Sequence, residues 1–264
     1  MTNPSEKLLV TLKDGIKRIT INRPERRNSV DHETVQLLRD AVQHSVDDGT
    51  RVVILTGAGD SFCAGADLAA TSASDIANFD VTKALRENVN PTILAMRNLP
   101  VPIIARVHGH AVGVGCNYAL ACDMIVASEQ ALFGQVFVKI GLMPDGGSTF
   151  FLPRLVGYQK AFELMTTGDI IGAQEAQQLG IVNKVVPFSE LDATVDTIAA
   201  RLGQAPGIAI AKIKAGLNHG SQSDLSAALE FEAVNQDACF HSPDFVEGVT
   251  AFVQKRKAVF GKGA

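Results

Sequence analysis

Apolar and polar residues alternate along the first strand-like segments of the chain. Residues 8–12 and residues 16–22 each show this alternation, and Asp14-Gly15 lies between them. Strict alternation is typical of a strand with one buried face, and Asp-Gly is a preferred turn between two antiparallel strands. The pattern therefore predicts a β-hairpin, which Pro24 ends.

Helical spacing replaces the alternation after the hairpin. Asp31 is a suitable N-cap residue, and Gly49 closes the segment. Between them, apolar side chains recur every three or four residues, at Val35, Leu38, Val42 and Val46. The run RVVILTG at 51–57 is almost wholly apolar, which is typical of a strand buried on both faces. We expect a helix followed by a central strand.

The middle of the chain combines glycine-rich loops with short apolar runs. The loop GAGDSFCAGADL at 57–68 precedes about 30 residues of helical periodicity. The apolar run VPIIARV at 101–107 then leads into HGHAVGVGCN, and a small-residue helix is expected over 116–122. MIVA at 124–127 is a further strand. The alternation of strands and helices predicts an α/β fold.

The second half of the chain is mostly helical. Asp145 lies in a turn before Gly146-Gly147, and we expect its carboxylate at the entrance of a helix. LVGYQKAFELMTTGD is predicted as one helix that ends at Gly168, and a short helix starts near 172–176. GIVNKVVP is the last predicted strand. Four helices are expected between residues 189 and 260.

Composition and charge exclude several classes of protein. The 264 residues are 46% hydrophobic, which suffices for one large domain with or without a helical appendage. A net charge of −4 gives no basic excess for nucleic acid or an anionic membrane. The 4 cysteines form no CxxC pair, so neither a zinc site nor a disulfide framework is expected. With no signal peptide or membrane span recognised, the cytoplasm is the expected compartment.

Candidate chemistry lies in the glycine-rich turns. A glycine turn at a helix start, as at Gly113 and Gly115, lets backbone N–H groups point at a ligand oxygen. Asp145 could exchange a proton with a ligand held there. A dinucleotide fingerprint is excluded, because GxGxxG would need a glycine where Tyr118 stands. Taken alone, the AGADL loop could still be an ordinary connection and Asp145 an ordinary N-cap.

Three segments together resemble the crotonase, or enoyl-CoA hydratase/isomerase, superfamily. They are AGADL, HGHAVGVGCNYALACD and FVKIGLMPDGGSTFFLPRLVG, and the likeness extends over nearly the whole chain. The resemblance implies an α/β spiral of strand–strand–helix turns over 1–200, which holds the acyl-CoA site. It implies a helical oligomerisation region over 201–264 and a homotrimer, or a hexamer built as a dimer of trimers. Coenzyme A would be part of the substrate, with no separate cofactor and no metal.

The resemblance also assigns roles to single residues. The backbone amides of Ala66 and Val114 would form the oxyanion hole for the thioester carbonyl. The phosphates of coenzyme A would need cations near the AGADL loop, and Arg26 and Arg27 are the candidates. Lys255 or Arg256, from the tail or a neighbouring subunit, is a weaker candidate. The remaining loop residues expected to surround the substrate are Ala64, Gly65, Asp67, Leu68, Gly113 and Gly115.

Two departures from the family pattern bear on the reaction. Hydratases of this superfamily use two glutamates to hold and activate water, and Asn117 and Phe137 occupy the matching positions. Asp145 matches the single acid of a branch that contains Δ3,Δ2-enoyl-CoA isomerases and ring-1,2-epoxyphenylacetyl-CoA isomerase of phenylacetate catabolism. The resemblance thus favours isomerisation, with Asp145 as acid and base. Asn117 would bind either the substrate or Asp145, and Phe137, Phe150 and Leu142 would line an apolar pocket.

Other reaction classes stay open. An enoyl-CoA hydratase of fatty-acid or aromatic degradation is the main alternative. A 4-chlorobenzoyl-CoA dehalogenase-like enzyme would use the aspartate as a nucleophile beside a tryptophan, and this chain has 0 Trp. An RNA-binding homologue of the superfamily is disfavoured by the acidic net charge.

Overall fold

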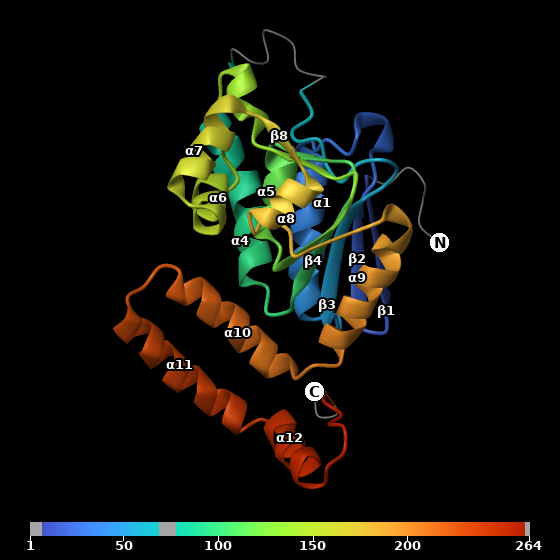
Figure 1. The fold of residues 1–264 in the computed structure, drawn as a ribbon, viewed down its shortest axis with the longest axis vertical. Coiled ribbons are helices and arrows are strands. Elements are labelled where there is room, and N and C mark those ends of the chain that lie inside the picture. Colours follow the sequence, from blue (N-terminus) through green and yellow to red (C-terminus); the bar gives the residue numbers. More distant parts are fainter. Residues whose placement is uncertain (1–6, 69–77, 262–264) are drawn as a thin grey trace.

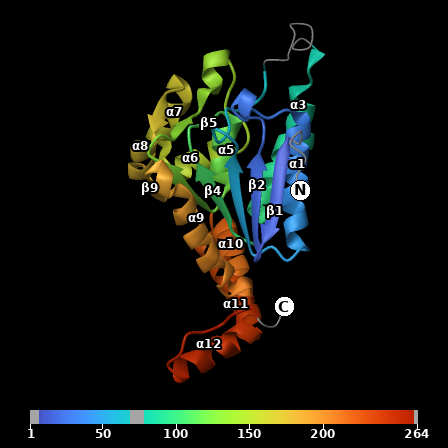
Figure 2. The ribbon, with the colours of Figure 1, turned by 90° about the vertical axis from the view of Figure 1, so that its right-hand side faces the viewer.

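The computed structural model describes residues 7–68 and 78–261 of the chain. A twisted sheet carries helices on both faces, and three C-terminal helices extend away from this body (Figures 1 and 2). The expected helical stretch before Pro100 lies partly outside the described residues. Its described part contains α3 (Val81–Ala84), a π-helical turn (Leu85–Val89) and α4 (Asn90–Asn98).

The main sheet has six strands in the order β1-β2-β3-β4-β6-β9. Only β1 and β2 pair antiparallel, which confirms the predicted hairpin, and the other neighbours pair parallel. Asp14 and Gly15 both have positive φ, at 52° and 74°, as a tight hairpin turn requires. The strands are β1 (Leu8–Lys13), β2 (Ile16–Ile21), β3 (Val52–Gly57), β4 (Ile103–Val107), β6 (Met124–Ser128) and β9 (Lys184–Val186).

The predicted central strand β3 is buried along its whole length, because helices cover both faces of the sheet. Val53 and Leu55 belong to the larger core, which includes side chains of α1 (His32–Gln43), α4 and α5 (Val114–Ala121). Val52 and Ile54 face the other way and belong to the core formed with α9 (Phe188–Gly203). Alternate side chains of one strand therefore serve two apolar layers.

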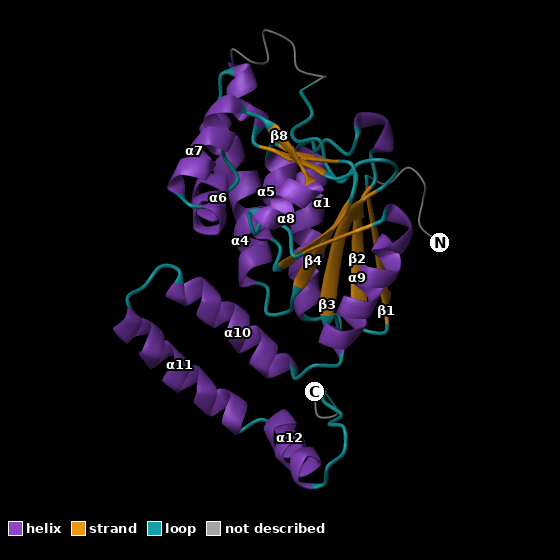
Figure 3. Ribbon diagram, viewed as in Figure 1, coloured by secondary structure: helices purple, strands orange, loops and turns teal. Residues whose placement is uncertain are grey.

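A second, three-stranded sheet has the order β5-β7-β8, and no pattern in the sequence predicts it. Its strands are β5 (His110–Val112), β7 (Leu132–Gly134) and β8 (Ile170–Gly172), drawn as the short arrows near the β8 label in Figure 3. Each strand has 3 residues, too few to show an alternating pattern. Helix α8 (Ala173–Gln178) follows β8, as expected from the sequence.

Three predicted boundaries were wrong. The helix predicted over LVGYQKAFELMTTGD starts later: Leu155 and Val156 end α6 (Ser148–Val156), Gly157 has a non-helical backbone, and α7 (Tyr158–Thr167) runs to the predicted end at Gly168. Val46 is 56% exposed, since the regular helix α1 ends at Gln43 and a short 3-10 turn follows. Helix α5 begins at Val114, two residues before its predicted start, so the glycine turn is joined directly to it.

Four C-terminal helices are present, as predicted. After α9 come α10 (Gly207–Gly220), α11 (Leu225–Phe240) and α12 (Pro243–Val253). The Lys214 ammonium anchors α10 to the body through the Asp123 carboxylate at 2.8 Å and the Met96 carbonyl oxygen at 3.0 Å. The domain division at residue 200 stays a prediction. No helix within the described residues is long and apolar enough to cross a membrane.

Candidate active site

The two glycine-rich loops of the sequence lie side by side at the small sheet. Cys63 forms an isolated parallel bridge with Ala111; its amide donates to the His110 carbonyl at 2.9 Å, and its own carbonyl accepts from Val112 at 3.1 Å. A Cβ on Gly115 would lie 2.2 Å from the Cys63 carbonyl oxygen, so only glycine permits this approach. Gly65 also faces the second loop: a Cβ there would lie 3.2 Å from the Val112 carbonyl oxygen, and its φ of 100° favours glycine.

The two amides expected to form the oxyanion hole belong to these loops. Val114 is the first residue of α5, where the helix dipole favours negative charge. Ala66 is exposed and lies opposite Val30 in an isolated parallel bridge. The hydrogen bonds of this bridge are made by the neighbours of Ala66: the Gly65 carbonyl accepts from the Val30 amide, and the Asp67 amide donates to the Val30 carbonyl. Within residues 7–68 and 78–261, the N–H groups of Ala66 and Val114 have no acceptor. Both donors are therefore available to a ligand oxygen.

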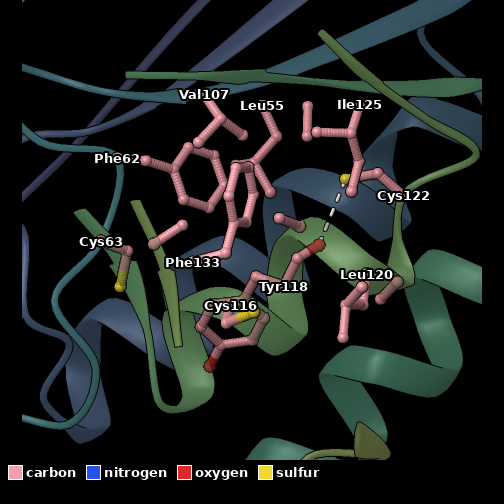
Figure 4. Packing of buried hydrophobic residues seen from close by; sticks show 14 of the residues in the cluster. Leu55, Phe62, Cys63, Val107, Cys116, Tyr118, Leu120, Cys122, Ile125 and Phe133 are labelled. Carbon is pink, nitrogen blue, oxygen red and sulfur yellow. Dashed lines mark hydrogen bonds between the residues drawn. The ribbon is translucent and has the colours of Figure 1, made fainter. Parts of the chain in front are cut away.

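The core below these loops keeps them in place. Tyr118, on α5, is fully buried and packs in one cluster with Phe62 and Phe133 (Figure 4). The Cys122 thiol donates to the Tyr118 carbonyl oxygen at 3.2 Å, drawn as the dashed line in Figure 4. Dense packing of this kind resists displacement of the backbone that it supports.

Asp145 lies in the turn before α6, but its side chain does not cap that helix. The N-cap residue is Gly147, and the Asp145 carbonyl accepts from the Ser148 amide at 3.2 Å. The Asp145 side chain is half-buried, and its buried Oδ1 atom has no hydrogen-bond partner among the described residues. Burial raises the pKa of the Asp145 carboxyl, because it disfavours the charged form. An unpartnered carboxylate of raised pKa is suited to accept a proton.

Asn117 holds the turn that carries Asp145. Its Nδ2 atom donates to the Asp145 backbone carbonyl at 2.8 Å, and its Oδ1 atom accepts from Gln135 Nε2 at 2.8 Å. Asn117 is fully buried. Of the two partners expected for Asn117, the structure shows Asp145, through the backbone rather than the carboxylate. Gln135 was missed because nothing in the sequence connects it with residue 117.

The Asp145 turn also packs against the oxyanion loop, which is the segment with Gly113 and Val114 at the start of α5. A Cβ on Gly146 would lie 3.4 Å from both the Val114 side chain and the Asn117 side chain. Phe137 lies on the other side of the loop: its ring tip is 4.0 Å from the Cβ position of Gly113, and its side chain is largely buried. The geometry thus brings Val114, Asn117, Phe137 and Asp145 to one place.

The other two residues of the expected apolar pocket have different surroundings. The Phe150 ring lies under the Arg154 guanidinium, 3.6 Å from its carbon, and Leu142 is 49% exposed. Only Phe137 is shown to contact the oxyanion loop, so the roles of Phe150 and Leu142 stay predictions.

The basic turn with Arg26 and Arg27 is joined to the AGADL loop. The Arg27 carbonyl accepts from the Ala64 amide at 3.0 Å, while both arginines are exposed. The turn is held below by Asn28, which was not predicted. This fully buried side chain donates to the Ala58 and Ser61 carbonyl oxygens at 2.7 and 2.6 Å. Two exposed cations therefore lie on the rim of the site.

The remaining loop residues have mixed roles. The Asp67 carboxylate pairs with the Arg23 guanidinium at 2.6 Å, which ties the loop to the chain before the basic turn. Leu68 is 56% exposed at the end of the described loop. In the tail, the Arg256 guanidinium is paired with Glu247 at 2.6 Å. Contacts of these residues with a substrate stay predictions.

His108 is held by two polar contacts within the chain. Its Nε2 lies 2.8 Å from the Gly59 carbonyl oxygen and its Nδ1 lies 2.8 Å from the Arg106 guanidinium. Burial lowers the pKa of His108, so the neutral ring fits these contacts. The described part of the chain contains no group of three or more His, Cys, Asp or Glu that could hold a metal ion. The expected absence of a cofactor stays a prediction.

Comparison with known proteins supports the resemblance seen in the sequence. The enoyl-CoA hydratase/isomerase family model matches residues 11–263. A crotonyl-CoA hydratase of Syntrophomonas wolfei is 40% identical over 97% of this chain and 98% of its own length. A 1,2-epoxyphenylacetyl-CoA isomerase of Escherichia coli K12 is 35% identical, also over 97% and 98%.

Solved structures agree with the fold. The crystal structure of an enoyl-CoA hydratase from Bacillus anthracis superposes with a TM-score of 0.89 at 33% identity, covering 97% of this chain and 99% of that one. The glycine loops with their free amides, the adjoining carboxylate and these likenesses lead to one conclusion. The chain belongs to the enoyl-CoA hydratase/isomerase family, the crotonase superfamily.

Proposed function

We propose that this enzyme isomerises acyl-CoA thioesters, with Asp145 as the acid and base. One observation carries the proposal: the buried Oδ1 atom of Asp145 has no hydrogen-bond partner among the described residues, and its turn packs against Val114 of the oxyanion loop. A carboxylate in this position can remove a proton beside a carbonyl held at the two amides. The substrate would be a 3-enoyl-CoA or ring-1,2-epoxyphenylacetyl-CoA.

The mechanism follows from the positions of these groups. The thioester carbonyl oxygen accepts hydrogen bonds from the Ala66 and Val114 amides, each typically worth about 3–4 kcal/mol to the transition state. For a 3-enoyl-CoA, Asp145 removes a proton from the α carbon, and the electron pair moves into the carbonyl to give an enolate. The same carboxyl returns that proton to the γ carbon, so the double bond moves and no atom is gained or lost. For the ring epoxide, the C–C bond that the epoxide shares with the six-membered ring breaks as the ring double bonds shift, which gives a seven-membered oxepin. Asp145 moves a proton from the α carbon to another carbon of the conjugated system, so no atom is gained or lost.

Hydration is the alternative, and the likeness to a crotonyl-CoA hydratase supports it. Our preference for isomerisation rests on Asn117 and Phe137. The Asn117 amide is occupied by the Asp145 carbonyl and by Gln135, and Phe137 is a hydrocarbon ring. Neither side chain can activate a water molecule by taking its proton. The dehalogenase-like alternative lacks the tryptophan that would accompany the aspartate, and the acidic net charge disfavours the RNA-binding alternative.

Coenzyme A would bind across the basic turn. Arg26 and Arg27 are exposed cations beside the AGADL loop, so they could pair with its phosphates while the thioester reaches the oxyanion hole. Arginine suits phosphate oxygens because it donates in a fixed fork.

We propose a homotrimer, or a hexamer of two trimers, for the assembly. Large apolar side chains of the C-terminal helices are exposed, with Phe252 at 84% and Leu225 at 75%. Such a concentration of apolar surface is typical of protein interfaces. The three buried cysteines Cys63, Cys116 and Cys122 are free thiols, which suits the cytoplasm proposed as its compartment.

A direct comparison of two activities tests the reaction class. Purified enzyme is assayed for isomerisation of a 3-enoyl-CoA and of the ring epoxide, and in parallel for hydration of crotonyl-CoA. We expect isomerisation to have the higher kcat/KM. Efficient hydration with no detectable isomerisation would establish the alternative.

A further inference from the structure

The end of strand β7 holds both halves of the site. The Gly134 carbonyl accepts from the amide of Gly113, which belongs to the oxyanion loop, at 2.9 Å. The next residue, Gln135, donates through Nε2 to Asn117 Oδ1 at 2.8 Å, and Asn117 in turn donates to the Asp145 carbonyl. Gly134 and Gln135, which are consecutive residues, therefore connect the oxyanion loop with the turn that carries Asp145.

The hydrogen bonds determine which way the Asn117 amide points. An asparagine side chain has a donor end and an acceptor end, and the backbone carbonyl of Asp145 can only accept. The donor end must face Asp145, which leaves Oδ1 toward residue 135. Gln135 supplies an N–H donor there and is buried, with only 3% of its surface exposed. Without that donor, Asn117 Oδ1 would be buried without a partner, which typically costs about 1–3 kcal/mol.

In the same arrangement, the Asp145 carboxylate takes no part in the hydrogen bonds that hold its turn. Asn117 binds the backbone of Asp145, and Oδ1 of the carboxylate keeps no partner among the described residues. Both supporting side chains are neutral amides, so they add no charge next to the base. A charged or carboxylate-binding support would change the protonation equilibrium of Asp145 as well as its position.

We propose that Gln135 is a positioning residue of the reaction: through Asn117, it sets where Asp145 stands relative to the oxyanion hole. The proposal rests on the proposed function, in which Asp145 is the base. Gln135 itself does not contact substrate in this assignment. Gln135 affects the distance between the Asp145 carboxylate and the substrate. Because the Asp145 turn packs directly on Val114, a displacement of this turn changes the separation between the carboxylate and the enolate oxygen at the Val114 amide.

The first test is kinetic. Gln135→Met keeps the length of the side chain but removes the N–H donor. We expect kcat for isomerisation to fall roughly tenfold to a hundredfold, since a misplacement of about 1 Å can cost a factor of 10². KM should stay within about twofold, because the oxyanion amides and the basic turn are untouched. Gln178→Met, at an exposed position of α8, is the matched control and should keep the parent kcat.

A double-variant cycle tests whether Gln135 acts through Asn117. Asn117→Leu alone should lower kcat, and Gln135→Met combined with Asn117→Leu should lower it no further. Losses that multiply in the double variant, or a Gln135→Met enzyme with the parent kcat, would overturn the proposal. If Gln135→Met does not fold, Gln135→Ala replaces it: the shortened, uncharged side chain cannot donate to Asn117, so the same loss of kcat is expected.

Crystal structures test the positioning role of Gln135 independently of the reaction that the enzyme catalyses. If the parent enzyme does not isomerise any acyl-CoA, the proposed function fails, but the geometric claim is still measurable. In Gln135→Met we expect the Asn117 side chain to shift from its parent position and its contact with the Asp145 carbonyl, 2.8 Å in the parent, to be lost. An unchanged Asn117–Asp145 contact in the variant would overturn the positioning role whatever the substrate is.

Discussion

Asn117 donates a hydrogen bond to the backbone carbonyl of Asp145 at 2.8 Å, and not to its carboxylate. This choice of atom holds the Asp145 turn against the oxyanion loop and leaves the carboxylate free for chemistry. Asn117 stands where the family resemblance places a glutamate of hydratases, and here its side chain binds the turn that carries the proposed base.

Replacing Asp145 should stop the proton transfer while substrate binding persists. Asp145→Asn keeps the shape of the side chain but removes the base, so kcat for isomerisation should fall about 10²–10⁴-fold. Asp47→Asn, at an exposed site of the same charge, is the control and should keep full activity. Steady-state kinetics and calorimetric binding of a CoA ester measure both quantities. Crotonyl-CoA hydration that is efficient and survives Asp145→Asn would contradict the isomerase assignment.

The raised pKa of Asp145 also predicts how stability changes with pH. Its ordinary value is 3.8, and burial raises it in the folded state. Between 3.8 and the raised value the folded chain binds more protons than the unfolded chain, so this group's contribution to stability falls as pH increases. The neutral amide that replaces the carboxyl in the Asp145→Asn variant cannot titrate.

Urea denaturation of both proteins across this pH range provides the measurement. The free energy of unfolding of the parent, minus that of Asp145→Asn, should decrease as pH rises through the window and level off above it. A difference that does not vary with pH would show that burial does not raise the pKa of the Asp145 carboxyl.

Loss of the basic turn should weaken binding of coenzyme A esters. Arg26→Gln with Arg27→Gln removes two exposed cations but keeps side chains of similar polarity and the turn itself. We expect KM for the CoA ester to rise roughly tenfold to a hundredfold, as for the loss of charge-assisted hydrogen bonds, with kcat nearly unchanged. Arg201→Gln, an exposed arginine of α9, serves as the control. An unchanged KM in the double variant would remove these residues from the CoA site.

Charges placed on the C-terminal helices should prevent assembly. Leu229 and Val246 are 55% and 63% exposed, on α11 and α12. Leu229→Glu with Val246→Glu should convert the trimer or hexamer to monomers, which light scattering detects at micromolar concentration. Leu12→Glu with Val46→Glu, at exposed positions near the N-terminus, should leave the parent mass unchanged. A parent protein that is already a stable monomer would refute the proposed assembly.

The sequence alone determined those parts of the fold that depend on local patterns. Alternation and an Asp-Gly turn predicted the hairpin β1-β2, and an unbroken apolar run predicted the buried strand β3. Glycine spacing indicated the turn before α5, where Gly113 has a φ of 56°, a backbone conformation that favours glycine. Resemblance added the family, which the comparisons confirm.

Only the tertiary structure decided the arrangement around Asp145. The small sheet has strands of 3 residues, which are too short for periodicity, so β5, β7 and β8 were not predicted. The bond from Gln135 to Asn117 joins residues 18 positions apart, and the bond from Asn117 to Asp145 spans 28. A local pattern cannot show such contacts, because they form only when the small sheet brings the end of β7 beside α5. The burial that raises the pKa of Asp145 has the same origin: it belongs to the packed site and not to any segment of the chain.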